Sequence, residues 1–264
     1  MTAIVEALPT TTGRLIEIRL LGALEVHRPD GSAVDGREWK TGKTLDLLRM
    51  LALTVGRPTP VDDLQASLWP DSEHSRAQSS LRTATFRIRQ VLGRDALERE
   101  FGGLRLHGAR VDVAGFRTLA NRTRHFLQAG DTTAAAMAAQ EADALYRGEL
   151  RAHDDGADWV VSERRSLDAI RQGLLCDGAE AVAALGLPAE AVDFARRVLA
   201  GNPYSERASR LLMAGYAGLG ETSAALREYD RCRRLLADEL GVDPAPQTQA
   251  VHLRILRGWQ LCSP

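Results

Sequence analysis

Residues 74–94 read HSRAQSSLRTATFRIRQVLGR, and this stretch decides what kind of fold the chain adopts. Its apolar positions recur at the spacing of an α-helix that buries one face. That stripe consists of Leu81, Thr85, Ile88 and Leu92. The stretch contains five arginines and no acidic residue. The sequence therefore predicts an amphipathic helix over residues 76–92 with a basic exposed face.

The face opposite the apolar stripe carries side chains that form hydrogen bonds. They are Arg76, Ser79, Ser80, Thr83, Arg87 and Gln90. Arginine bonds guanine O6 and N7 or grips phosphates, and serine, threonine and glutamine bond base edges or the DNA backbone. Arg82 and Arg89 project sideways, where a helix in the major groove meets the sugar-phosphate walls. This pattern indicates a DNA recognition helix. The alternative is a solvated basic face that pairs with acids of the same chain, such as Asp62, Asp63 or Glu98.

The three segments before this helix indicate the kind of domain to which it belongs. Residues 15–26 combine β-branched and alternating positions and predict a strand hairpin. Residues 41–55 have helical periodicity, and residues 59–68 predict a short helix that Trp69-Pro70 ends. A short helix, a loop and a basic helix form a helix-turn-helix.

The segment after the basic helix predicts a wing. Gly93 ends the helix, and residues 97–106 form two short strands around a turn at Phe101. In a winged helix-turn-helix such a hairpin lies along the minor groove, with Arg99 and Arg105 near the DNA backbone. Phe101 either stays at this tip or packs inward.

The segment 36–44, GREWKTGKT, nearly spells a phosphate-binding P-loop. That motif needs four residues between its first glycine and Gly-Lys-Thr, and here there are five. We expect instead that Thr41 caps a helix and that Lys40 and Lys43 approach DNA phosphate or solvent. No other catalytic or metal-binding motif occurs, so we expect no enzymatic activity, no cofactor and no metal site.

The second half of the chain is rich in Ala, Leu, Glu and Arg and predicts helices only. Gly186 and Gly220 lie 34 residues apart, and the same offset pairs Ala191 with Ala225. This is the tetratricopeptide period, and Gly130 marks a weaker third copy. The fold class is therefore mainly α with a small β component, a winged helix-turn-helix followed by an all-α tetratricopeptide-like domain; a plain helical bundle is the alternative.

Several motifs carry a resemblance to a known family. Trp39–Thr44, Leu45–Leu48, Asp63–Trp69 and Leu81–Gly93 look like the OmpR/PhoB-type DNA-binding domain. Trp159, Ser162–Arg165, Pro203–Arg207, Leu211–Met213 and Leu235–Pro244 are similar to the bacterial transcriptional activation domain. Together, over roughly residues 15–257, they resemble the small form of the Streptomyces antibiotic regulatory protein (SARP) family.

The resemblance implies a transcriptional activator. It implies binding to direct repeats in double-stranded DNA upstream of promoters for secondary-metabolite biosynthesis, and oligomerisation on that DNA. It also implies recruitment of RNA polymerase through sigma factor and the C-terminal domain of the α subunit. The family's base-contacting positions fall on Arg76, Ser79, Thr83 or Ala84, and Arg87. Ala84 replaces a long polar residue and Phe86 a basic one. The rival interpretation is a protein-interaction scaffold whose winged helix binds no DNA.

The length and composition of the chain indicate its domain organisation, and its apolar runs indicate its location in the cell. The chain has 264 residues, 44% of them hydrophobic, and a formal net charge of −1. We expect a disordered N-terminus (1–14), a winged-helix domain (15–108), an activation domain (112–258) and a tail (259–264). The N-terminus shows no secretory signal and no apolar run is long enough for a membrane span, which predicts a cytoplasmic protein.

Overall fold

The computed structural model describes residues 15–258, so the predicted N-terminus (1–14) and tail (259–264) lie outside the described residues. The chain forms two compact units. The winged-helix unit comprises the described residues up to Ala114 together with Arg147–Glu163. The helical unit comprises Gly115–Tyr146 and the described residues from Arg164 onward. Residues 147–163 fall within the predicted activation domain, yet they fold with the winged helix.

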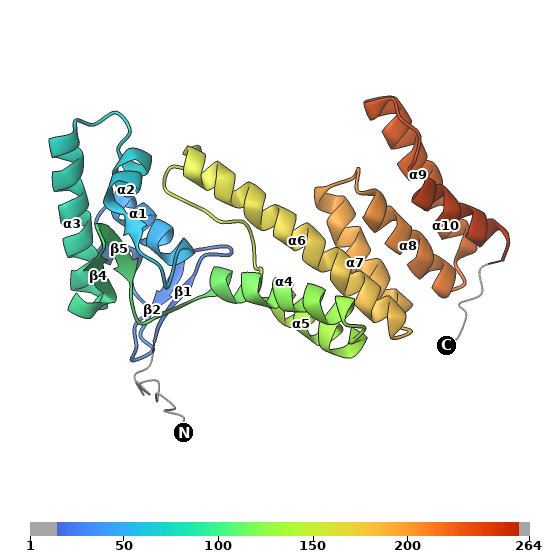
Figure 1. Ribbon diagram of the computed structural model, residues 1–264, viewed down its shortest axis with the longest axis horizontal. Coiled ribbons are helices and arrows are strands. Elements are labelled where there is room, and N and C mark those ends of the chain that lie inside the picture. Colours follow the sequence, from blue (N-terminus) through green and yellow to red (C-terminus); the bar gives the residue numbers. More distant parts are fainter. Residues whose placement is uncertain (1–14, 259–264) are drawn as a thin grey trace, which may run out of the picture. The chain divides into compact units, whose positions relative to one another are not determined.

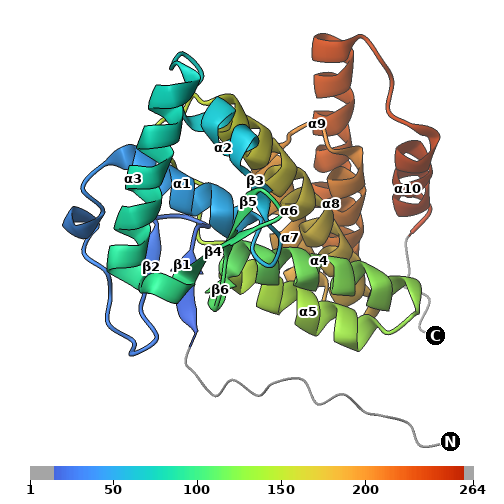
Figure 2. The same cartoon turned by 60° about the vertical axis from the view of Figure 1, so that its left-hand side comes forward.

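A three-stranded sheet opens the winged-helix unit. β1 (Ile16–Arg19) pairs antiparallel with β2 (Glu25–His27) and parallel with β6 (Ala109–Val111), in the order β2-β1-β6 (Figure 2). Ile16 and Ile18 alternate into the core, with 4% and 1% of their surface exposed. The strand hairpin was predicted from alternation. β6 has three residues and too short a pattern for such a prediction.

Three helices pack against one another in this unit. They are α1 (Gly42–Leu53), α2 (Val61–Leu68) and α3 (His74–Leu92), and Figure 1 shows α3 beside α1 and α2. A 3-10 helix, η1 (Gly36–Trp39), precedes α1 and buries Trp39. All three predicted helices are confirmed. One boundary was wrong: Thr59–Pro60 forms a strand, β3, rather than the start of α2.

The wing is also confirmed. After a second 3-10 helix, η2 (Arg94–Ala96), β4 (Leu97–Glu100) and β5 (Gly103–Leu106) form an antiparallel hairpin, and β3 adds to its far side in the order β3-β5-β4. Phe101 forms the turn with a φ of 47° and is 93% exposed, so it stays at the tip rather than packing inward. The Phe101 side chain therefore contributes nothing to the core.

Between Asp112 and Leu256 the regular secondary structure is helical, apart from isolated β-bridges at Leu150. The helices are α4 (Asp112–Gln128), α5 (Thr132–Leu145), α6 (Asp158–Ala184), α7 (Pro188–Gly201), α8 (Glu206–Gly218), α9 (Thr222–Leu240) and α10 (Pro246–Leu256). None of the helices within residues 15–258 is long and apolar enough to cross a membrane.

The internal repeat predicted from the 34-residue period is present as three similar turns. Gly130, Gly186 and Gly220 follow α4, α6 and α8 and have φ values of 79°, 75° and 77°. In each turn an amide donates to a carbonyl five residues earlier: Asp131 to Phe126 at 2.9 Å, Leu187 to Val182 at 3.0 Å and Glu221 to Tyr216 at 2.8 Å. Glycine suits these positions because residues that carry a side chain rarely adopt a positive φ. Each turn therefore ends one helix and starts the next in the same way.

Small residues let these helices approach closely. Ala191 and Ala225 are fully buried, as the repeat predicted. A Cβ atom on Gly215 of α8 would lie 2.7 Å from Cγ2 of Val192 of α7, closer than packing allows. The fold class is confirmed as a winged helix followed by tetratricopeptide-like helices.

The two described cysteines are expected to resist thiol reagents. Cys176 and Cys232 are 3% and 1% exposed, and burial raises the pKa of the Cys176 thiol to about 11. Since the thiolate is the reactive form, the folded Cys262→Ser variant is expected to react with an aromatic disulfide reagent at pH 8 at least about a hundredfold more slowly than the same variant in urea. Equal rates in the two conditions would contradict this packing.

Candidate nucleic-acid interface

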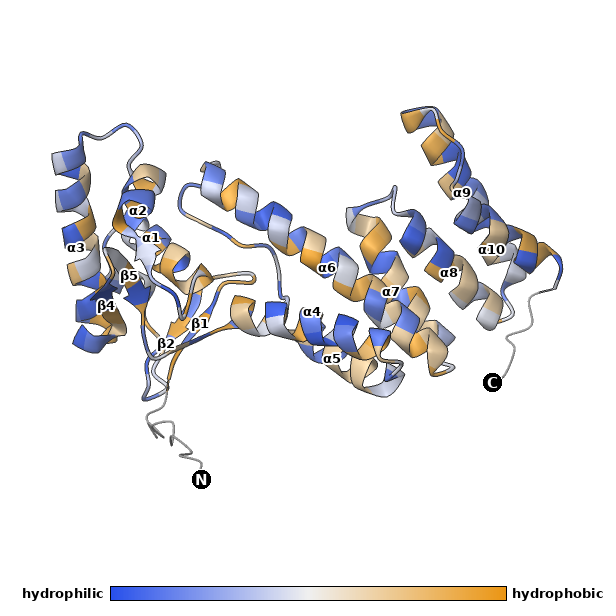
Figure 3. Cartoon of the chain, viewed as in Figure 1, coloured by the Kyte–Doolittle hydropathy of each residue, from blue (hydrophilic) through white to orange (hydrophobic). Residues whose placement is uncertain are grey.

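The outer face of α3 presents most of the predicted DNA contacts to solvent. The buried stripe is as predicted, with Leu81, Thr85, Ile88 and Leu92 all at most 7% exposed. The exposed residues are Arg76, Ser79, Arg82, Thr83 and Gln90, and Ser80, Arg87 and Arg89 are half-buried. Hydrophilic colours prevail along α3 in Figure 3. One straight element therefore carries these eight side chains.

A groove of about 310 Å³ runs between α3 and the start of α1. Its lining residues are Thr41, Lys43, Thr44, Trp69, Ser79, Ser80, Thr83, Ala84 and Arg87. The groove thus brings together five predicted contact residues that come from two elements: Lys43 from α1, and four from α3. Its lining contains no carboxylate.

Arg87 is fixed at the N-terminus of α1. Its Nη1 donates to Oγ1 of Thr41 at 3.2 Å, and the same hydroxyl accepts a hydrogen bond from the Thr44 amide at 3.4 Å. Thr41 is the N-cap of α1, as predicted. A helix N-terminus attracts anions through its free amides and its dipole, and here Lys43 and Arg87 add two positive charges. The groove is suited to a phosphate group.

The arginines of α3 form no ion pairs with acids of the described chain. Arg76 and Arg82 have none, and Asp62 and Asp63 do not approach α3 within ion-pair distance in residues 15–258. Glu98 pairs with Arg105 instead, at 2.7 Å. A basic face neutralised by these three acids is therefore not the arrangement that forms.

Two of the arginines predicted to contact DNA form contacts within the winged-helix unit. Arg89 donates through Nη2 to the carbonyl oxygen of Leu97 at 2.8 Å, which ties α3 to the wing. Arg105 lies between Glu98 and Glu100, at 2.7 and 3.1 Å. The hydrogen bond from Arg105 lowers the pKa of the exposed Glu98 carboxyl. For these two arginines a DNA contact stays a prediction.

The remaining predicted contacts lie outside the groove. Arg99 is exposed on β4 and has no ion pair among the described residues. Lys40 is exposed after η1, with a φ of 60° that turns the chain into α1. Both are accessible to a ligand that extends past α3.

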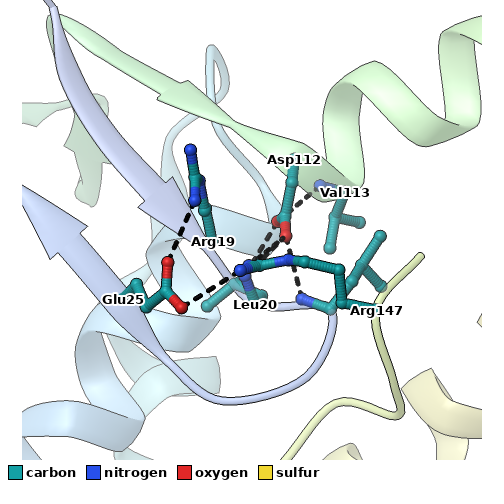
Figure 4. Close-up of polar contacts among 7 residues, drawn as sticks. Arg19, Leu20, Glu25, Asp112, Val113 and Arg147 are labelled. Carbon is teal, nitrogen blue, oxygen red and sulfur yellow. Dashed lines mark hydrogen bonds and ion pairs between the residues drawn. The ribbon is translucent and has the colours of Figure 1, made fainter. Parts of the chain in front are cut away.

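Residues 147–157, which we term the strap, run along the winged-helix unit. Leu150 forms β-bridges with Leu21 and Gly22. Arg147 pairs with Glu25 at 3.1 Å and approaches Asp112 at 4.0 Å (Figure 4). These contacts join the strap to one end of the first sheet, where β1 and β6 end and β2 begins.

Asp112 holds the end of β1 in place through hydrogen bonds to backbone amides. Its carboxylate accepts hydrogen bonds from the amides of Leu20 at 2.8 and 2.9 Å and of Leu21 at 2.9 Å (Figure 4). Burial raises the pKa of this carboxyl, although those amides and Arg147 oppose the shift. The end of β1 is thereby fixed to the start of α4.

The strap then reaches α1. The amide of His153 donates to Oδ1 of Asp46 at 2.9 Å, and Arg49 donates to the same oxygen at 2.9 Å. A Cβ atom on Gly42 would lie 1.8 Å from Cδ2 of His153, so only glycine allows this approach. Sequence reasoning missed the strap because these residues form no local pattern.

The strap also supplies a carboxylate next to the groove. Oδ2 of Asp154 lies 3.7 Å from Nζ of Lys43. Lys43 lines both the groove against α3 and a second hollow of about 400 Å³ that includes Asp154 and Trp159. The ammonium group of Lys43 thus lies between the groove and this second hollow. Residues 15–258 contain no cluster of side chains suited to a metal ion.

Comparisons with known proteins agree with this architecture. The family described as bacterial transcriptional activator domain matches residues 111–256. The regulatory protein AfsR of Streptomyces coelicolor is 34% identical over 232 residues, which cover 84% of this chain and 23% of AfsR. The chain therefore spans less than a quarter of AfsR.

Other relatives match over more of their own length. The regulatory protein DnrI of Streptomyces peucetius is 27% identical over 92% of this chain and 92% of DnrI. The structure of Mycobacterium tuberculosis EmbR in complex with a low affinity phosphopeptide superposes with a TM-score of 0.80 and 28% identity, over 94% of this chain and 66% of that chain.

Proposed function

Since this chain belongs to the SARP family of transcriptional activators, we propose that it binds specific DNA through α3 and the wing and thereby activates transcription. In this proposal α3 enters the major groove, with Arg76, Ser79 and Arg87 toward base edges. The groove between α1 and α3 receives a backbone phosphate. The protein acts as a cytoplasmic regulator and catalyses no reaction.

One observation carries the proposal: the exposed face of α3 is basic, has no acidic partner in the described chain, and adjoins a positively charged helix N-terminus. DNA contacts need that combination, because phosphates fix the position of the protein and base edges provide specificity. A scaffold that binds only proteins has no need of it.

The salt dependence of DNA binding tests this function. We expect the full chain to bind a labelled fragment of its own upstream region in a gel shift, with unrelated DNA as competitor. The logarithm of affinity should fall with the logarithm of salt concentration, with a slope of about −0.9 per phosphate contacted. The absence of a shift at low salt would favour the scaffold.

The proposal includes finer steps that the family resemblance suggests. The operator consists of direct repeats, on which two or more copies assemble. The helical unit contacts RNA polymerase through sigma factor and the C-terminal domain of the α subunit. Footprinting tests the first step: protection of two repeats about 10–11 bp apart, or a multiple of that spacing, would place the copies on one face of the DNA. Protection of an inverted repeat would contradict it.

The Asp154→Asn variant is expected to bind DNA about two- to fivefold more tightly at low salt. The carboxylate of Asp154 competes with phosphate for Lys43, and an exposed pair of this kind is worth about 0–1 kcal/mol. Anisotropy titrations with a labelled operator measure the change. The Lys43→Ala variant supplies the control, because adding Asp154→Asn to it should have little further effect; an equal gain in both backgrounds would exclude this competition.

A further inference from the structure

A third hollow, of about 240 Å³, lies between α2, α3 and the wing. Its apolar walls come from Val61 of α2, Leu81 and Phe86 of α3, and Leu104 of β5. Phe86 is 60% exposed, although most aromatic side chains of this size are covered. A concave apolar wall beside an exposed aromatic ring is typical of a binding site.

The charges around this cavity have one sign. Arg82, Arg89 and Arg99 line it, and no acidic residue does. Arg82 and Arg99 form no ion pair within residues 15–258. Arg89 bonds the carbonyl oxygen of Leu97, a neutral group that does not cancel its charge. The ligand that complements this lining is an anion with an apolar body.

A buried amide adds an independent indication. Gln65 lines the cavity and is 5% exposed, and its Nε2 has no hydrogen-bond partner among the described residues. A buried donor without an acceptor is costly, and such groups are uncommon in folded proteins. A ligand oxygen that accepts from this amide would remove the cost.

We propose that this cavity is an effector site for a small apolar carboxylate. The ring or alkyl body of the ligand packs against Phe86 and Leu104. Its carboxylate accepts a hydrogen bond from Nε2 of Gln65 and pairs with Arg82 or Arg99. The volume is below the roughly 300–1,000 Å³ of sites for drug-sized molecules, so the ligand is about the size of a bicyclic aromatic acid.

Occupation of this site opposes DNA binding, a consequence that rests on the proposed function. Arg82 and Arg99 are among the residues assigned to DNA contact, and a bound carboxylate withdraws them from phosphate. The protein would therefore leave its operator when the acid accumulates.

Titration of the full chain with 2-naphthoate, without DNA, tests the site itself. Calorimetry is expected to show saturable binding at one site, weakened at least tenfold by Phe86→Ala. Phe101→Ala is the matched control, since Phe101 is 93% exposed and lines no part of the cavity. Absence of saturable binding, or an equal loss in Phe101→Ala, would overturn the proposal.

A second variant separates the effector site from DNA binding. Gln65→Leu keeps the size of the side chain and removes the unpaired donor, so its melting temperature should not fall. We expect 2-naphthoate to lower the operator affinity of the wild type at least fivefold and that of Gln65→Leu less than twofold. Naphthoate binding without any effect on operator affinity would overturn the competition. If the wild type binds naphthoate but no DNA, the proposed function is refuted, whereas the proposal that this cavity binds a small carboxylate stands.

Discussion

Replacing Asp46 with alanine is expected to lower the free energy of unfolding of the winged-helix unit by about 3–5 kcal/mol. Asp46 is fully buried and Arg49 is 7% exposed, with 2.9 Å between Oδ1 and Nη1. Burial already lowers the pKa of the Arg49 guanidinium, and Asp46 opposes that shift. Without this carboxylate the buried Arg49 guanidinium loses its hydrogen-bonded acid, and the amide of His153 loses its acceptor. Urea unfolding followed by tryptophan fluorescence measures the change, because Trp39 is buried in this unit.

Two further variants identify the cause of that loss. Asp154→Ala removes an exposed carboxylate from the same unit and should cost less than about 1 kcal/mol. The double variant Asp46→Leu/Arg49→Met removes both charges and should recover a large part of the lost stability, because apolar residues of similar size often replace buried ion pairs at little cost. A double variant as unstable as Asp46→Ala would show that the unpaired charge is not responsible.

Arg87→Ala is expected to weaken specific operator binding by about 1–3 kcal/mol, which corresponds to a roughly 5- to 150-fold loss of affinity. The guanidinium is held at the N-terminus of α1 by Thr41, so it needs little reordering before it contacts DNA. Anisotropy titrations with operator and with unrelated DNA measure the effect. The loss should be larger on the operator, because a base contact is lost as well as a charge.

Arg110→Ala provides the matched control for that experiment. Arg110 is exposed on β6 and belongs to no predicted contact set, so its removal should change operator affinity less than twofold. Equal losses for the two variants would mean that the net charge of the unit, rather than the face of α3, determines affinity.

Elements with a strong local pattern could be predicted from the sequence. Helix α3 begins two residues before the predicted start and ends at the predicted Leu92, because its apolar stripe and Gly93 are both local signals. The same is true of the wing and of the three glycine turns. These elements depend on neighbours within a few residues along the chain.

Features that depend on distant residues could not be predicted. Asp46 and Arg49 have the spacing of an exposed helix pair, and only the strap and the packing of α1 reveal that they are buried. Phe101 is apolar but exposed, because the left-handed turn holds it at the tip of the wing. Tertiary structure also decides which arginines form hydrogen bonds within the protein. An example is the bond from Arg89 to the carbonyl oxygen of Leu97.

The central claim, that the outer face of α3 reads bases in the major groove, is tested most directly by methylation interference at guanine N7. The wild type is expected to lose binding when specific guanines in each repeat carry the methyl group, because N7 lies in the major groove. Arg87→Ala should become insensitive to methylation at one guanine per repeat and keep the remaining pattern. An unchanged pattern in Arg87→Ala, or no interference in the wild type, would contradict this account of the interface.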